Sequence, residues 1–226
     1  MRLGIRTALT SAALLCASWA HATVFIGLQQ NAGPIVTVAS NAGGFAIFAG
    51  AFGEFESVAV AGFGQPSTLP PLLFQGGISL GNSAGSDNAG TLSIYVTSTG
   101  NTTPLGILQF TSNLGTGFLT QGSTETQQTY LDPGNGVFAL TTPLGSATFT
   151  TADSELDTVV ANTGGGPYSV TAVFIYSAPT FGSAAGSIGL SAAAVTTPPP
   201  TVPEPATLAL LGVALTGLAL ARRRKQ

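Results

Sequence analysis

Short runs rich in Val, Ile, Phe and Thr alternate with clusters of Gly, Pro and Asn from about residue 23 to residue 195. These clusters favour tight turns, because Gly and Asn accept a positive φ and Pro pre-sets the start of a turn. Short apolar runs between such clusters predict strands, and almost no segment of helical length has a helical period. The pattern predicts an all-β chain with a single antiparallel β-sandwich of jelly-roll type. The turn clusters are residues 43–44, 81–83, 132–136 and 164–167.

Two of the expected strands alternate clearly enough to assign faces. Residues 91–97 place Leu92, Ile94 and Val96 on one face. In residues 168–177 the even-numbered side chains line one face and the odd-numbered side chains the other, and either set could face the core. The other expected strands are residues 23–28, 35–39, 45–49, 54–60, 105–111, 117–120, 124–131, 136–141, 147–150, 156–160 and 188–195.

Charge is distributed unevenly along the chain. The six basic residues lie in the first six and last five positions, and the single Cys and single His lie before Thr23. Residues 23–201 therefore contain acids but no Lys, Arg, His or Cys, and their formal charge is −8, although the whole chain has a net charge of −3. The eight acids are Glu54, Glu56, Asp87, Glu125, Asp132, Asp153, Glu155 and Asp157.

This composition excludes many kinds of chemistry from the central domain. Without His, Cys or Lys, the usual pairs of nucleophile and base cannot form, and zinc, copper and haem lose their usual ligands. Without Lys or Arg, phosphate and nucleic acid have no cationic side chain to bind. Disulfides cannot form either. We expect no catalytic residues, no cofactor and no nucleic-acid partner.

Three acids at alternate positions form the best candidate for a metal site. Asp153, Glu155 and Asp157 resemble the first half of a calcium loop, but the Gly and the final bidentate Glu of an EF-hand are missing. A solvated strand or loop is the simpler interpretation. Carboxylates without a neighbouring cation do attract divalent ions, so weak calcium binding at these three residues stays open.

Two further functions remain open for the central domain. A glycosidase can work with two carboxylates, and Glu54 and Glu56 around Phe55 are the best available pair. A carbohydrate-binding module would require aromatic rings exposed on one sheet face, although the thirteen Phe residues fit a core better than a platform. Two acids in one cleft would indicate the first function, and an exposed patch of Phe or Tyr the second.

Residues 1–22 have the form of a secretory signal peptide. Arg2 and Arg6 provide the positive start, and a mostly apolar run follows. Ala20 and Ala22 form an Ala-x-Ala cleavage site, which predicts a mature chain that begins at Thr23.

The last residues, 202–226, combine a proline motif, an apolar run and a cationic end. Residues 206–221 would form a helix about 24 Å long, slightly short for a comfortable membrane span. The cations resist crossing a bilayer, so they act as a stop-transfer signal and keep the preceding chain outside the cytoplasm. They are Arg222, Arg223, Arg224 and Lys225. Residues 196–201, with three consecutive prolines, predict an extended linker between this tail and the domain at residues 23–195.

The tail resembles the PEP-CTERM sorting signal of Gram-negative bacteria. Pro203, Glu204 and Pro205 match its motif, and the apolar helix and the basic end follow in the same order. This resemblance implies that an exosortase recognises and cleaves the tail, and that the chain stays in the inner membrane, facing the periplasm, until it is processed. It also implies a host that makes extracellular polysaccharide.

The sequence therefore predicts an exported, non-enzymatic protein of the cell surface or extracellular matrix. Its low charge and lack of Lys leave strand edges poorly guarded, which favours self-association or association with envelope polymers, with calcium as a potential bridge. Carbohydrate binding and carboxylate-only hydrolysis are the alternatives.

Overall fold

A computed structural model gives the fold, and it describes residues 22–65, 68, 72–81, 90–178 and 182–195. Residues 1–21 of the expected signal peptide (1–22), the linker and the sorting tail lie outside these ranges, whereas Ala22 of the expected cleavage site is described and is buried. Within them, no helix has the length and apolarity needed to cross a membrane. The chain divides into two units, Met1–Ala194 and Val195–Gln226, and the fold described below belongs to the first.

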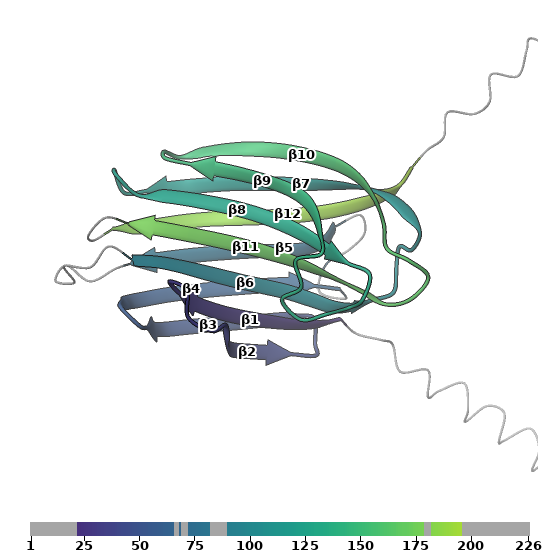
Figure 1. The fold of residues 1–226 in the computed structure, drawn as a ribbon, viewed down its shortest axis with the longest axis horizontal. Coiled ribbons are helices and arrows are strands. Elements are labelled where there is room, and N and C mark those ends of the chain that lie inside the picture. Colours follow the sequence, from purple (N-terminus) through teal and green to yellow (C-terminus); the bar gives the residue numbers. More distant parts are fainter. Residues whose placement is uncertain (1–21, 66–67, 69–71, 82–89, 179–181, 196–226) are drawn as a thin grey trace, which may run out of the picture. The chain divides into compact units, whose positions relative to one another are not determined.

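The predicted all-β sandwich is confirmed: two six-stranded antiparallel sheets, A and B, pack face to face (Figure 1). Sheet A contains, in spatial order, β2 (Val36–Asn41), β1 (Thr23–Gln30), β6 (Gly90–Asn101), β11 (Tyr168–Ala178), β8 (Thr124–Asp132) and β9 (Thr142–Phe149). Sheet B contains β10 (Asp153–Asn162), β7 (Ile107–Leu119), β12 (Ser183–Ala194), β5 (Leu72–Gly81), β4 (Phe55–Gly64) and β3 (Phe45–Phe52).

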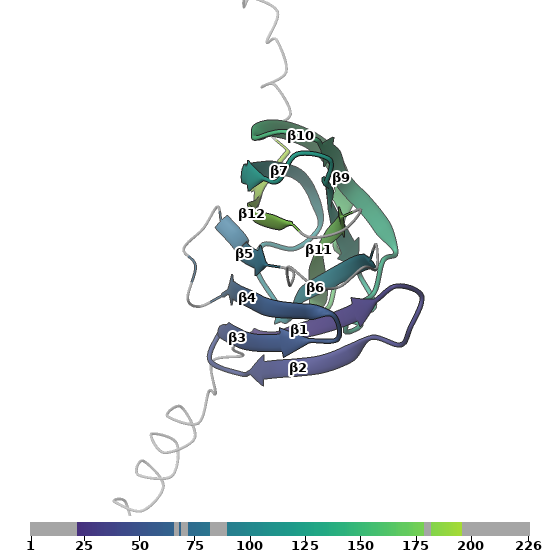
Figure 2. The same cartoon turned by 90° about the vertical axis from the view of Figure 1, so that its left-hand side faces the viewer.

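The last eight strands form a jelly roll. Their two halves have the orders β6-β11-β8-β9 and β10-β7-β12-β5, and the chain crosses between the sheets at every step from β5 to β12 except β8 to β9. This arrangement is the double Greek key of a jelly roll. The first four strands extend it: β1 pairs with β6 and β2 with β1, while β4 pairs with β5 and β3 with β4 (Figure 2).

Alternation along the central strands places the core between the sheets. Leu92, Ile94 and Val96 are fully buried on one face of β6, as predicted. On β11 the even-numbered side chains belong to the core, so the odd-numbered set faces outward. Phe174, for example, is fully buried in the core. A cross-strand period of two thus fixes which side chains remain available on the outer face of sheet A.

Three expectations about strands are wrong. Residues 136–141 form a loop rather than a strand, because Asp132 binds the Gly134 and Gly136 N–H groups and Phe138 has a φ of 56°. Strand β5 was not expected, since its glycines hide the alternation of its apolar side chains. Residues 105–111 and 117–120 were expected as separate strands, but a single strand, β7, runs through this region.

Candidate functional site

The three candidate calcium ligands lie on β10, an edge strand of sheet B. Asp153, Glu155 and Asp157 alternate, so their side chains share one strand face. Glu155 lies opposite the fully buried Leu114 of β7, which shows that this face is on the core side of sheet B. Asp153 and Glu155 are nevertheless exposed and Asp157 is half-buried, because β10 forms the margin of the sandwich.

Two carboxylates of this trio, those of Asp153 and Asp157, bind backbone groups of the protein. Asp157 Oδ2 accepts a hydrogen bond from the Ser146 N–H of β9 at 2.8 Å, which links the edges of the two sheets. Asp153 Oδ1 accepts one from the Ser154 N–H at 2.7 Å. Within the described ranges, no three acidic, His or Cys side chains form a group that could hold a metal ion. The trio instead has the form of an edge guard, since inward-facing charges on an edge strand oppose pairing with another strand.

The candidate glycosidase pair lies at the start of β4. Glu54 precedes the strand and Glu56 is exposed on it. Phe55, between them, is fully buried and packs edge-on against Tyr176, with ring centroids 6.2 Å apart. Because this ring belongs to the core, it cannot serve as a sugar platform between the two acids.

Among the described residues, the most buried carboxyl group is one that the sequence pattern does not single out. Glu125 of β8 is fully buried between the sheets. Its Oε2 accepts a hydrogen bond from the Thr116 hydroxyl at 2.8 Å, and its Oε1 accepts one from Gln127 Nε2 at 2.7 Å. Burial raises the pKa of Glu125 above its ordinary value, although these two hydrogen bonds partly offset the effect.

Gln127 extends this polar cluster across the interior to sheet B. Its Oε1 accepts a hydrogen bond from the Gly115 N–H at 2.8 Å, and its Nε2 donates one to the Gly115 carbonyl at 2.9 Å. On the facing strand β12, a Cβ at Gly186 would overlap Glu125 Oε1 and lie 2.7 Å from Gln127 Nε2. A glycine there makes room for the buried pair. The cluster is fully hydrogen-bonded and closely packed, so we interpret it as structural.

The sequence of β8 explains why this cluster was missed. The strand reads Thr-Glu-Thr-Gln-Gln-Thr-Tyr from residue 124 to residue 130, with polar side chains at both parities. Hydrophobic alternation therefore gives no indication of which face is buried. The buried set is Glu125, Gln127 and Thr129, and the outward set is Thr126, Gln128 and Tyr130.

The outer face of sheet A carries a patch of uncharged polar and aromatic side chains. Tyr95 donates a hydrogen bond to Gln29 Oε1 at 2.7 Å, and Tyr130 donates one to Gln128 Oε1 at 3.0 Å. Burial raises the pKa of Tyr95, the Ser93 hydroxyl opposes this, and Tyr130 adds to it. We call this patch the polar face, and it consists of Gln29, Ser93, Tyr95, Thr126, Gln128 and Tyr130.

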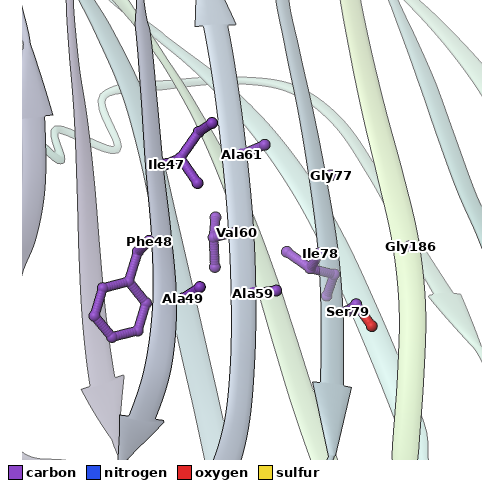
Figure 3. Close-up of a pocket in the computed structure, with 10 residues that line it drawn as sticks. All are labelled: Ile47, Phe48, Ala49, Ala59, Val60, Ala61, Gly77, Ile78, Ser79 and Gly186. Carbon is purple, nitrogen blue, oxygen red and sulfur yellow. The ribbon is translucent and has the colours of Figure 1, made fainter.

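The outer face of sheet B has a different character. A shallow hollow with a cavity volume of about 320 Å³ lies over β3, β4 and β5 (Figure 3). Its lining includes Ile47, Ala59, Ala61 and Gly77, and the Ser79 hydroxyl is the single polar side-chain group among the lining residues. These side chains provide no acid, base or metal ligand, so the hollow has no groups that could catalyse a reaction or bind a metal.

The C-terminal tail has its own match. Residues 201–225 match the PEP-CTERM protein-sorting motif. This chain carries a PEP-CTERM sorting signal. The motif contains the predicted Pro203, Glu204 and Pro205, together with the cations Arg222, Arg223, Arg224 and Lys225. A PEP-CTERM signal implies an exported protein that an exosortase sorts and that is processed at the membrane and bound at the surface.

Three solved structures resemble the domain ahead of the PEP-CTERM signal, each of them distantly. Tailspike protein 4 of bacteriophage CBA120 has 12% sequence identity and a TM-score of 0.32 over 68% of this chain, and the chain spans about a fifth (20%) of that tailspike. TmCBM61, solved in complex with β-1,4-galactotriose, has 8% identity and a TM-score of 0.26, with coverage of 51% of this chain and 69% of its own. Infectious bursal disease virus, strain Gx, has 14% identity and a TM-score of 0.26, with coverage of 78% and 52%.

These TM-scores are too low for the likenesses to bear on function. A comparison with curated proteins gives no match.

Proposed function

We propose that this chain is an exported, non-enzymatic protein of the cell surface or extracellular matrix, associated with extracellular polysaccharide. The PEP-CTERM tail supports delivery to the surface. The composition of residues 23–201, which lack His, Cys, Lys and Arg, supports a role without covalent chemistry. On this proposal the tail holds the chain in the inner membrane until an exosortase processes it.

The placement of the carboxylates carries the non-enzymatic part of the proposal. Glu125 is buried in its own hydrogen-bond cluster, and Asp157 binds the backbone of β9. Asp132 is held in its turn by the Gly134 and Gly136 N–H groups. Carboxylates with these structural roles are poorly placed to act as the acid and base of a glycosidase, which must both face one substrate.

Asp132 also shows the electrostatic consequence of such a role. Burial works to raise its pKa, but hydrogen bonds from the Gly136 N–H, the Thr141 hydroxyl and the Gly134 N–H outweigh burial and lower the pKa below its ordinary value. The carboxylate therefore stays ionised inside its loop, whereas a general acid needs a raised pKa.

Fractionation of the native host tests the proposal. The wild-type chain and a Glu204→Ala variant are followed by immunoblot in inner-membrane, outer-surface and extracellular-polysaccharide fractions. We expect wild-type protein, shortened at its C-terminus, in the polysaccharide fraction, and we expect the uncleaved variant in the inner membrane. An intact wild-type chain that stays in the inner membrane, as the variant does, would contradict sorting and indicate a simple anchor.

Carbohydrate binding is the second candidate function, and the polar face of sheet A is the observation that favours it. Phenol, amide and hydroxyl groups on one sheet face match the hydroxyl-rich surface of a sugar.

A further inference from the structure

We infer that the polar face of sheet A is the surface through which this protein holds an uncharged polysaccharide chain. This inference rests on the proposed function, because it names the class of polymer and the residues that would contact it. It depends on three features of the described residues: the continuity of the face, its lack of charge, and the loop that bounds it.

The strand register makes the polar face continuous across sheet A. Gln29 of β1 lies opposite Ser93 of β6, and Ser93 lies opposite Ile175 of β11. Ile175 in turn lies opposite Thr126 of β8, which faces Thr148 of β9. One row of outward side chains therefore crosses five strands, which are about 4.8 Å apart. That spacing is close to the length of one hexose unit.

A second row runs parallel to the first. Tyr95 of β6 lies opposite Val173 of β11, which lies opposite Gln128 of β8. Tyr130, two residues after Gln128 on β8, also points outward. The two rows together alternate hydroxyl, amide and aromatic groups with two aliphatic side chains, Val173 and Ile175. Sugar rings have the same alternation, with polar edges and apolar faces.

Some side chains of the polar face are buried by their neighbours, and others are accessible. Ser93 and Tyr95 are only 8% and 9% exposed, and Val173 is 1% exposed, although all three project away from the core. Gln128 and Tyr130 are half-buried and remain accessible. Neighbouring side chains therefore cover Ser93, Tyr95 and Val173, whereas Gln128 and Tyr130 offer an amide and a phenol group for contact.

The loop after β8 closes one end of the polar face. The Phe138 ring packs against Tyr95, with centroids 5.9 Å apart, and the Phe138 N–H donates a hydrogen bond to the Thr97 hydroxyl at 3.2 Å. Thr97 also exchanges a hydrogen bond with Thr171 at 2.9 Å. These contacts occupy the Thr97 and Thr171 hydroxyls, so the accessible part of the polar face lies around the half-buried Thr126, Gln128 and Tyr130.

Charge favours an uncharged polymer over an anionic one. In the described strands of sheet A the ionisable carboxyl groups are Glu125, which faces the core, and Asp132, whose two oxygens are bound within its own loop. Asp132 is ionised and follows Tyr130 on the outward side of β8, but the Gly134 and Gly136 N–H groups and the Thr141 hydroxyl occupy its oxygens. The residues of the polar face themselves are uncharged. The domain as a whole is anionic, with a formal charge of −8 over residues 23–201, so an anionic polymer would be repelled and would find no cation here.

Native affinity electrophoresis of the full-length chain in mild detergent and calcium-free buffer tests this inference. The gels contain hydroxyethylcellulose, galactomannan, laminarin or the neutral fraction of the host's own extracellular polysaccharide, with alginate as the anionic probe. We expect a neutral polymer to retard the wild-type protein and alginate to have no effect.

Variants on the two outer faces locate the contact. Tyr130→Ala and Gln128→Ala should each weaken retardation about tenfold, because they remove the half-buried but accessible ring or its amide partner. Gln109→Ala and Phe63→Ala provide matched controls, since both residues are exposed on the other sheet, and they should stay within about twofold of wild type. Circular dichroism confirms that each variant is folded. If Tyr130→Ala does not fold, the retardation of Tyr130→Phe and Gln128→Ala is compared with that of the wild-type protein instead.

Several results would overturn the inference. Retardation by none of the neutral polymers, retardation by alginate alone, or equal losses in the sheet A and sheet B variants would each do so. Such a result leaves the proposed function intact as long as the host still delivers the wild-type chain to the polysaccharide fraction. Conversely, loss of sorting with normal binding in the gel would contradict the proposed function alone.

Discussion

Gln127 of sheet A hydrogen-bonds both backbone groups of Gly115 in sheet B, with its Oε1 2.8 Å from the Gly115 nitrogen and its Nε2 2.9 Å from the Gly115 oxygen. A side-chain amide of one sheet thus binds the backbone of the other and ties the two sheets together through the core. Apolar packing holds sandwiches together without fixing register, whereas this contact specifies which residues of the two sheets face each other.

Gln127→Ala should destabilise the domain strongly. The substitution leaves the Gly115 N–H and carbonyl without this partner and removes a hydrogen-bond donor from the buried Glu125. We expect the free energy of unfolding to fall by roughly 2–4 kcal/mol, as measured by urea denaturation. Gln128→Ala, on the next residue but facing outward, is the control and should change it by less than about 0.5 kcal/mol. Equal effects of the two substitutions would contradict the role of the buried amide.

The buried carboxyl group of Glu125 predicts a pH dependence of stability. Burial raises its pKa in the folded protein, so the folded state holds this proton more tightly than the unfolded chain does. The stabilising effect is complete below the ordinary pKa of glutamate and is lost as pH rises through the folded-state pKa.

Glu125→Gln removes this titration and keeps an oxygen to accept the Gln127 hydrogen bond. We expect a higher Tm than wild type at about pH 8 and a difference close to zero at about pH 4. Thermal denaturation across this range, followed by circular dichroism, measures both. A variant that is less stable than wild type at pH 8 would show that the ionised carboxylate is favourable in its site.

Two tyrosines on the core face of β11 predict opposite effects of the same substitution. Tyr168 and Tyr176 are both fully buried, but the Tyr176 hydroxyl lies 3.1 Å from the Ser123 hydroxyl, whereas the Tyr168 hydroxyl has no hydrogen-bond partner among the residues that the structure describes. Tyr168→Phe should raise the free energy of unfolding by about 1 kcal/mol, and Tyr176→Phe should lower it by about the same amount. Paired urea titrations provide the comparison, and a clear loss for Tyr168→Phe would reveal a partner for its hydroxyl.

The acids of β10 place charge on one edge of a chain whose low overall charge otherwise favours self-association. Asp153→Asn with Glu155→Gln removes two inward-facing charges from the edge strand while leaving the Asp157 contact to β9 intact. We expect this double variant to self-associate in sedimentation velocity runs at lower concentrations than the wild-type chain. Asp153→Lys with Glu155→Lys restores charge and should associate no more than the wild-type chain. Added calcium should act like neutralisation if the trio binds it, and association of all three proteins alike would count against an edge guard.

Much of the sandwich follows from local sequence, and the exceptions have identifiable causes. Leu92, Ile94 and Val96 alternate with smaller or polar neighbours, so their common face could be read directly. Strand β5 contains Gly76 and Gly77, which have no side chain and so interrupt the alternation of apolar residues that would predict a strand. The turn cluster at residues 132–136 predicts the start of the loop after β8 but not its continuation through Phe138, whose positive φ of 56° is uncommon for an aromatic residue.

The candidate functional surface was harder to predict than the fold. The polar face depends on which alternate residues of β8 point outward, and on a strand register that joins Gln29 to Thr148 through three intervening strands. Those positions are far apart in the sequence, and a pattern within one strand cannot pair them. The acids were visible in the sequence, but their roles depend on tertiary partners. Asp157, for example, faces Ser146 only because β9 and β10 meet at the margin of the sandwich.

The release of reducing ends from the host's own extracellular polysaccharide tests the central claim most directly. Purified full-length protein is incubated with this polymer, and new chain ends are counted alongside co-sedimentation of protein and polymer. We predict co-sedimentation without new chain ends, as expected for a surface protein that binds and does not cleave. Release of chain ends by the wild-type protein, abolished by Glu54→Gln with Glu56→Gln, would contradict this account.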